Sequence, residues 1–81
     1  MPLYTLLQRP NSEMFMEIFI NGESRKVPEG MSVTEMLGMM SLQGKRVAVE
    51  VNLEIVPRSE HAVWKLRPGD RVEIVQAIGG G

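Results

Sequence analysis

The dipeptide Asn21-Gly22 is the feature that most constrains the fold of this 81-residue chain. Both residues tolerate the positive φ of a type I′ turn, and the pair is the strongest short-range signal for a β-hairpin. Residues 14–20 alternate with a period of two, which is the period of a strand. One face of this strand carries Met16, Ile18 and Ile20. We therefore expect an antiparallel return strand over residues 23–27, ended by Pro28, which has no N–H to donate.

A helix is predicted to begin at Val33. Ser32 and Glu35 have the spacing of a capping box, in which each side chain bonds the backbone N–H of the other residue. The apolar residues that follow recur at i, i+3, i+4 and i+7 and form one stripe: Val33, Met36, Leu37 and Met40. This stripe is expected to pack on the hairpin, which gives a ββα order.

The rest of the chain predicts a mixed sheet. We expect a strand over residues 47–52, a turn into a short strand at 55–56, one helical turn at 59–61 and a last strand from residue 71. The last strand should lie centrally and parallel to the first, with Val72 and Ile74 buried against Ile18 and Ile20. The predicted class is α+β, with four to five strands and one main helix on one face.

Composition divides the chain and excludes several functions. Residues 1–13 are predicted to be an extended or disordered leader, residues 14–78 the folded domain and residues 79–81 a flexible glycine tail. The net charge of −1 gives no basic footprint for nucleic acid. There is no cysteine, and His61 is the single histidine, so no metal site or bound cofactor is expected. No apolar run or signal peptide indicates a membrane, and the expected location is cytoplasmic. When free, the chain is expected to be a monomer.

Catalysis by the chain itself is not expected. Glu50 and Glu54 are interpreted as solvated positions on strands rather than an acid–base pair. Ser59 and His61 have no adjoining aspartate, so they do not form a nucleophilic triad, and His61 is expected at the surface or in a hinge. A domain of this size also has little room for a deep pocket.

The C-terminal segment is the leading functional candidate. A strand pattern runs into Gly79-Gly80-Gly81, and the one reactive group this end can present is the α-carboxylate of Gly81. A vestigial linker is the competing interpretation. Val75 and Ala77 should form an outward apolar patch that docks a partner, and Trp64 either joins this patch or plugs the edge of the core. The basic pair Lys45-Arg46 is interpreted as solvated charge.

Three sequence blocks resemble the ThiS family, the sulfur-carrier proteins of thiamine biosynthesis. The blocks are Asn-Leu-Glu-Ile-Val-Pro-Arg at residues 52–58, Pro-Gly-Asp-Arg-Val-Glu-Ile at 68–74 and Val-Gln-Ala-Ile-Gly-Gly-Gly at 75–81. The similarity covers about residues 14–81 and leaves the leader unmatched.

The resemblance implies a ubiquitin-like β-grasp fold and a role as protein co-substrate rather than enzyme. It implies that a ubiquitin-activating-type adenylyltransferase, using ATP and magnesium, converts the Gly81 carboxylate into an acyl adenylate. Sulfur from a donor such as a cysteine desulfurase would then give a thiocarboxylate for thiazole synthase. The implied partner-binding residues are Val75, Ala77, Ile78, Gly79 and Gly80, with Gly79 the least firmly assigned because the family pattern has two terminal glycines.

Two alternatives remain open at this point. The small subunit of molybdopterin synthase has the same fold and thiocarboxylate, although the block at residues 52–58 favours the thiazole branch. A ubiquitin-like modifier or interaction module would instead form an isopeptide bond through Gly81, or use the tail for no chemistry.

Overall fold

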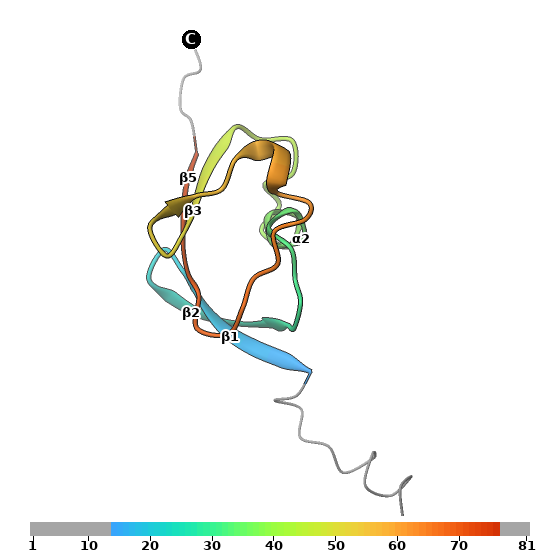
Figure 1. Cartoon of the computed structure of the whole chain (residues 1–81), viewed down its shortest axis with the longest axis vertical. Helices are drawn as coiled ribbons and strands as arrows, with labels where there is room; N and C mark the ends of the chain where they lie inside the picture. Colours follow the sequence, from blue (N-terminus) through green and yellow to red (C-terminus); the bar gives the residue numbers. More distant parts are fainter. Residues whose placement is uncertain (1–13, 77–81) are drawn as a thin grey trace, which may run out of the picture.

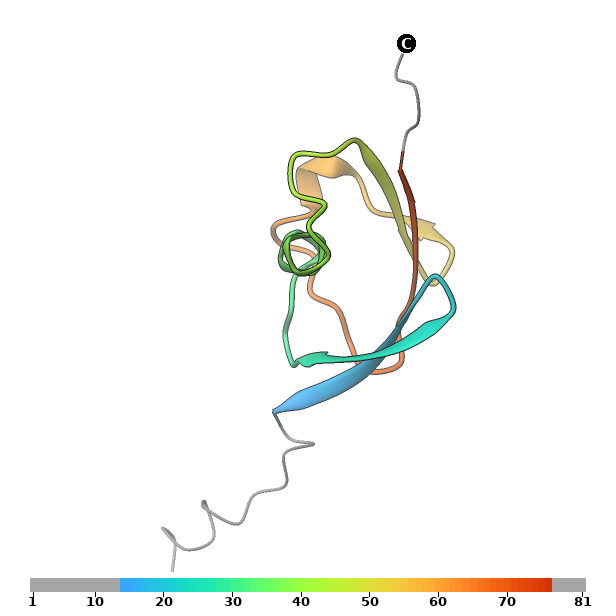
Figure 2. The same ribbon diagram turned by 180° about the vertical axis from the view of Figure 1, so that it is seen from behind.

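The computed structural model describes residues 14–76 (Figure 1). The predicted leader and the site residues Ala77, Ile78, Gly79, Gly80 and Gly81 lie outside this part of the chain. Five strands form one mixed sheet in the order β2-β1-β5-β3-β4, and helix α2 covers one face of it (Figures 1 and 2). The predicted α+β class, with one main helix on one face of the sheet, is confirmed.

The predicted hairpin is present. Strands β1 (Phe15–Ile20) and β2 (Glu23–Pro28) pair antiparallel from Phe15↔Pro28 to Ile20↔Glu23. The turn residues Asn21 and Gly22 have φ of 50° and 86°, the positive values that a type I′ turn requires. The inward residues of β1 are buried, as predicted: Met16, Ile18 and Ile20.

Strand β5 (Arg71–Gln76) lies at the centre of the sheet, as predicted. It runs parallel to β1 through the pair Ile20↔Val72 and antiparallel to β3 (Val47–Val51). The edge strand β4 (Glu54–Ile55) begins one residue earlier than expected. Val72 and Ile74 are both buried, so the central strand is fixed by the core.

Helix α2 (Val33–Met39) begins with the predicted capping box. The Glu35 N–H donates to Ser32 Oγ at 3.0 Å, and the Ser32 N–H donates to Glu35 Oε1 at 2.8 Å. Val33, Met36 and Leu37 are buried, whereas Met40 is half-buried and packs against the core. The helix is far too short to cross a bilayer, and residues 14–76 contain no other helix that could.

Acid should weaken this cap. The backbone hydrogen bond from Ser32 holds the pKa of Glu35 below its usual value of 4.5. A carboxylate whose pKa is lower in the folded state stabilises the fold at pH values above its usual pKa. This contribution is lost as the pH falls through the lowered pKa. We expect Glu35→Gln, which keeps an acceptor but no charge, to make the free energy of unfolding fall less steeply between about pH 5 and pH 3. Urea titrations across this range test it, and an unchanged slope would contradict it.

The end of the helix contains a strained residue. The Leu42 N–H donates to Leu37 O at 2.8 Å and the Ser41 N–H to Gly38 O at 3.0 Å, the pattern of a Schellman motif. Ser41 has φ of 61° at the position that glycine usually occupies. Ser41→Gly should therefore raise the free energy of unfolding by about 0.5–1 kcal/mol.

A matched control for this change is Gly44→Ala. Gly44 also has positive φ, and a Cβ there would meet nothing within 4 Å, so the substitution adds backbone strain without a clash. It should lower the free energy of unfolding by about 1 kcal/mol. Thermal or urea unfolding of both variants checks the pair, and changes of the same sign would refute the strain argument.

His61 corrects the prediction of a surface or hinge residue. It follows the single helical turn η2 (Arg58–Glu60) and is only 8% exposed. Its Nε2 lies 3.2 Å from the Val56 carbonyl oxygen, and its own carbonyl accepts the Thr34 N–H. His61 therefore links η2 to the start of the helix. Trp64 is half-buried against the core, as the edge-plug interpretation predicted.

Candidate docking surface at the end of the central strand

Strand β5 presents two different faces. Val72 and Ile74 point into the core beneath α2, whereas Val75 is 66% exposed on the opposite, outer face of the sheet. The position of Val75 agrees with the expected outward patch. β1 pairs with β5 only at Arg71 and Val72, whereas β3 pairs with it as far as Gln76, so β3 supports the last residues of β5.

The hairpin turn holds β5 on one side. Asn21 Oδ1 accepts the Ile74 N–H at 2.8 Å, and Asn21 Nδ2 donates to Ile74 O at 3.3 Å. The Asn21 N–H also donates to Val72 O at 2.8 Å. β1 ends at Ile20, so the Asn21 side chain takes the place of a neighbouring strand for the backbone of Ile74.

A hollow lies beside the end of β5 on its other side. It has a volume of about 380 Å³ and combines apolar side chains with two guanidinium groups; its lining residues are Arg46, Val47, Ala48, Arg58 and Val75. Ala48 is the cross-strand partner of Val75, and Val47 is the partner of Gln76. The hollow therefore adjoins the end of β5 at Gln76.

The outer face of the sheet carries charged side chains farther along β5 from the apolar pair Val75 and Ala48. Glu50 of β3 lies opposite Glu73 of β5, a like-charge arrangement that a sheet normally avoids. On the β1 side, the Arg71 guanidinium stacks over the Phe19 ring at 5.1 Å. Carboxylates thus occupy the middle of this face, whereas Arg46 and Arg58 lie with Val75 near the end of β5.

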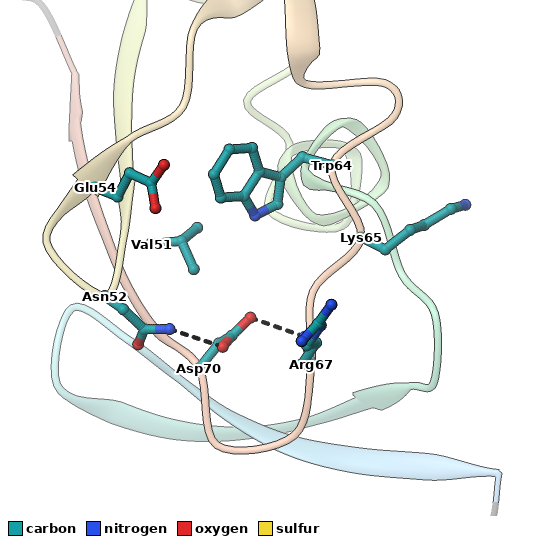
Figure 3. Close-up of a pocket in the computed structure, with 7 residues that line it drawn as sticks. All are labelled: Val51, Asn52, Glu54, Trp64, Lys65, Arg67 and Asp70. Carbon is teal, nitrogen blue, oxygen red and sulfur yellow. Dashed lines mark hydrogen bonds between the residues drawn. The ribbon is translucent and has the colours of Figure 1, made fainter.

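A second pocket, of about 290 Å³, lies at the other end of β3 and β5 (Figure 3). Asp70 forms its floor: Oδ1 accepts Asn52 Nδ2 at 3.0 Å and Oδ2 accepts the Arg67 N–H at 2.8 Å (Figure 3). Asn52 Oδ1 in turn accepts the Arg71 N–H at 2.9 Å. These bonds satisfy both side chains, so we assign them to holding the turn that starts β5.

The possible catalytic groups do not converge. Glu50 pairs with Ile55 and Glu54 with Val51, so alternation along the strands places the two carboxylates on opposite faces of the sheet. The Nε2 atom of His61 is engaged in a hydrogen bond with the Val56 carbonyl oxygen. Within residues 14–76, no three histidine or carboxylate side chains cluster as metal ligands would.

Of the predicted site residues, Val75 alone is described, and it is exposed where the hypothesis requires. The structure adds Arg46, Ala48 and Arg58, which sequence reasoning did not include. A signal was available for Arg46, since it precedes a strand predicted to lie in the same sheet. Arg58 stands in the block that resembles the ThiS family, but its proximity to Val75 depends on the tertiary fold.

Comparison with known proteins agrees with this architecture. Residues 18–81 match the model of the ThiS family. The chain is 30% identical over 66 residues to the sulfur carrier protein ThiS of Escherichia coli, covering 82% of this chain and 100% of that protein. It superposes on the crystal structure of the thiamine biosynthesis protein ThiS from Geobacter metallireducens with a TM-score of 0.71 and 33% identity, covering 82% of this chain and 100% of that one.

A second kind of relative is much longer. The chain is 47% identical over 66 residues to a thiazole synthase of Paramagnetospirillum magneticum, covering 82% of this chain but 20% of that protein. A thiazole synthase of Magnetococcus marinus is matched over the same fraction of its length at 33% identity. The chain thus spans about a fifth of these two relatives.

Proposed function

Because the chain belongs to the ThiS family of sulfur carriers in thiamine biosynthesis, we propose that Gly81 carries the sulfur as a C-terminal thiocarboxylate. The protein is then a co-substrate that partner enzymes act upon, not a catalyst. In this proposal the chain binds no cofactor itself, and the activating partner uses ATP and magnesium. Because the reaction consumes ATP, the proposed location is the cytoplasm.

The proposed chemistry has three steps. A bare carboxylate has no good leaving group, so it must first be activated. A Gly81 carboxylate oxygen attacks the α-phosphorus of ATP, and pyrophosphate leaves. A persulfide sulfur then attacks the acyl carbon and expels AMP, which forms an acyl disulfide. A second thiol cleaves this disulfide and releases the thiocarboxylate, whose sulfur thiazole synthase takes into the thiazole ring.

The observation that carries this proposal is the position of β5. β5 is a central strand whose residues Val72 and Ile74 are buried, whereas Val75 near its end is exposed. The residues that follow are therefore attached to a strand that the core holds in place. Glycine has no side chain, so Gly79, Gly80 and Gly81 suit a segment that must enter a narrow active site in another protein. Val75, Ala77 and Ile78 are proposed to contact that protein next to the entry.

The partners are proposed on two grounds. Thiazole synthase is supported by the two longer relatives that bear this name and contain a region similar to this chain. The ubiquitin-activating-type adenylyltransferase and a sulfur donor such as a cysteine desulfurase follow from the proposed chemistry, since a carboxylate must be activated before sulfur replaces oxygen.

Intact-mass measurement tests the function. The chain is incubated with ATP, magnesium, the adenylyltransferase and the sulfur donor. We expect a mass gain equal to the difference between one sulfur and one oxygen atom, dependent on ATP. Conjugates to lysine side chains without this gain would support a ubiquitin-like modifier instead and would overturn the proposal.

Charge placed on the apolar patch should impair docking more than folding. Val75 is exposed, so Val75→Glu should change the free energy of unfolding by less than about 0.5 kcal/mol. Loss of an apolar contact at the interface should raise the KM of the chain as substrate of the adenylyltransferase by about tenfold. The exposed residue Val63, which lies in the loop after η2, offers Val63→Glu as a control with unchanged KM. Equal KM values for all three proteins would count against docking at Val75.

A further inference from the structure

The hollow beside the end of β5 has the make-up of a recognition site. Val75 and Ala48 face each other across strands and give it an apolar floor, while Arg46 and Arg58 supply two positive charges at its border. Apolar centres bordered by charged groups are the usual arrangement of a protein interface. Val75 and both arginines are exposed, so a partner can reach them.

The two arginines have no carboxylate partner within the part of the chain that the structure describes. Among residues 14–76, the ion pair between side chains joins Arg25 and Glu23 at 3.7 Å, on the far edge of the sheet. Arg58 Nη2 reaches the Lys45 carbonyl oxygen at 3.5 Å, a long contact with a neutral group. Both guanidinium groups therefore keep their capacity for a carboxylate.

The hollow is too far from the reacting carboxylate to take part in the chemistry when the tail is extended. Five residues separate Gln76 from the end of Gly81, and five extended residues span up to about 17 Å. A partner that receives the tail in a channel must meet the hollow with the surface around the channel entrance. The charges of the hollow therefore act in recognition, where they set orientation and encounter rate.

We propose that the activating adenylyltransferase docks in this hollow with an acidic segment, whose apolar side chain contacts Val75 and Ala48 while carboxylates pair with Arg46 and Arg58. This inference rests on the proposed function and extends it to the chemistry of the partner surface. The Glu50–Glu73 pair in the middle of the outer face repels the same acidic segment, so the charges favour one position, at the end of β5.

Binding of the full chain to the adenylyltransferase, measured by calorimetry without ATP, tests the proposal apart from the chemistry. We expect Arg46→Glu with Arg58→Glu to raise the Kd at least about tenfold and to reduce its dependence on salt. The conservative pair Arg46→Lys with Arg58→Lys keeps the charge and should remain within about threefold of the unchanged chain. Arg25→Glu with Arg67→Glu makes the same change of net charge elsewhere and should have little effect.

The outcomes separate this inference from the proposed function. An unchanged Kd for the double reversal, with normal thiocarboxylate formation, would overturn the acidic docking site and leave the carrier function standing. A raised Kd for both the reversal and its distant control would show a general charge effect and would also overturn it. If the double reversal weakened binding to thiazole synthase but not to the adenylyltransferase, the hollow would serve the other enzyme and the proposal would be overturned. If the reversal unfolds the chain, as circular dichroism would show, Arg46→Gln with Arg58→Gln replaces it with the same expected direction.

Discussion

Deletion of Gly80 and Gly81 is expected to abolish thiocarboxylate formation and leave the fold intact. The proposed acyl transfer takes place at the Gly81 carbonyl, and a chain shortened by two residues cannot bring its new carboxylate as far into the partner. Each lost residue shortens the reach by about 3.5 Å, whereas reacting atoms must approach within about 3–3.5 Å. We therefore expect a rate below the limit of detection by intact mass.

The same deletion should not change thermal unfolding. Among residues 14–76, the buried apolar side chains extend from Met16 to Ile74. Glycine has no side chain, so loss of Gly80 and Gly81 removes no apolar side chain from a core. A variant that keeps the length, with Gly80→Ala, is the control: it should fold equally well but react more slowly, because a side chain must then pass through the channel. A large loss of stability on deletion would mean that the tail packs on the domain and would contradict the account.

The second large effect is expected at Asn21. Asn21→Ala removes both side-chain hydrogen bonds to the Ile74 backbone and places alanine at φ of 50°. Each lost bond costs about 1 kcal/mol, and the left-handed conformation adds about 1 kcal/mol. We expect the free energy of unfolding to fall by about 2–3 kcal/mol, a large fraction of the stability of so small a domain.

Two further variants separate these causes. Asn21→Gly keeps the turn conformation and loses the bonds alone, so it should cost about 1–2 kcal/mol. Asn21→Asp keeps an acceptor for the Ile74 N–H but puts a carboxylate oxygen against the Ile74 carbonyl, and should also destabilise the fold. Urea unfolding of the three proteins measures the differences. Equal losses for alanine and glycine would show that the backbone conformation contributes nothing.

Asn21 also shows how far the sequence alone leads. The turn was predictable because its signal is local: two adjacent residues that tolerate positive φ between two strands. The capping box of Ser32 and Glu35 was predictable for the same reason. The bonds from Asn21 to Ile74 join residues 53 positions apart, and no local pattern reports such a pair.

The errors and omissions have the same physical origin. His61 looked like a surface residue because a lone histidine in a polar turn has no period to mark it as buried. The tertiary fold packs it against the start of α2, where its carbonyl accepts the Thr34 N–H, and removes it from solvent. Arg46 looked like an ordinary solvated charge, and Arg58 carried no separate prediction. Their common position beside Val75 depends on the antiparallel pairing of β3 with β5 and on the fold that brings η2 next to these strands.

The sequence was more informative about which residues anchor the last strand. Alternation along residues 71–76 predicted that Val72 and Ile74 are buried and Val75 exposed, and the structure confirms all three. The roles of residues 77–81 remain predictions, since they lie outside the described residues. Their chemistry is proposed from the family and from the strand that precedes them.

Transfer of a labelled sulfur atom tests the central claim most directly. The chain is first converted to its thiocarboxylate with a heavy sulfur isotope, purified, and then incubated with thiazole synthase and its small-molecule substrates. We predict that the label appears in the thiazole product in equal amount to the carrier consumed, while the carrier returns to its original mass. A labelled carrier that persists while unlabelled thiazole forms would contradict the proposed function.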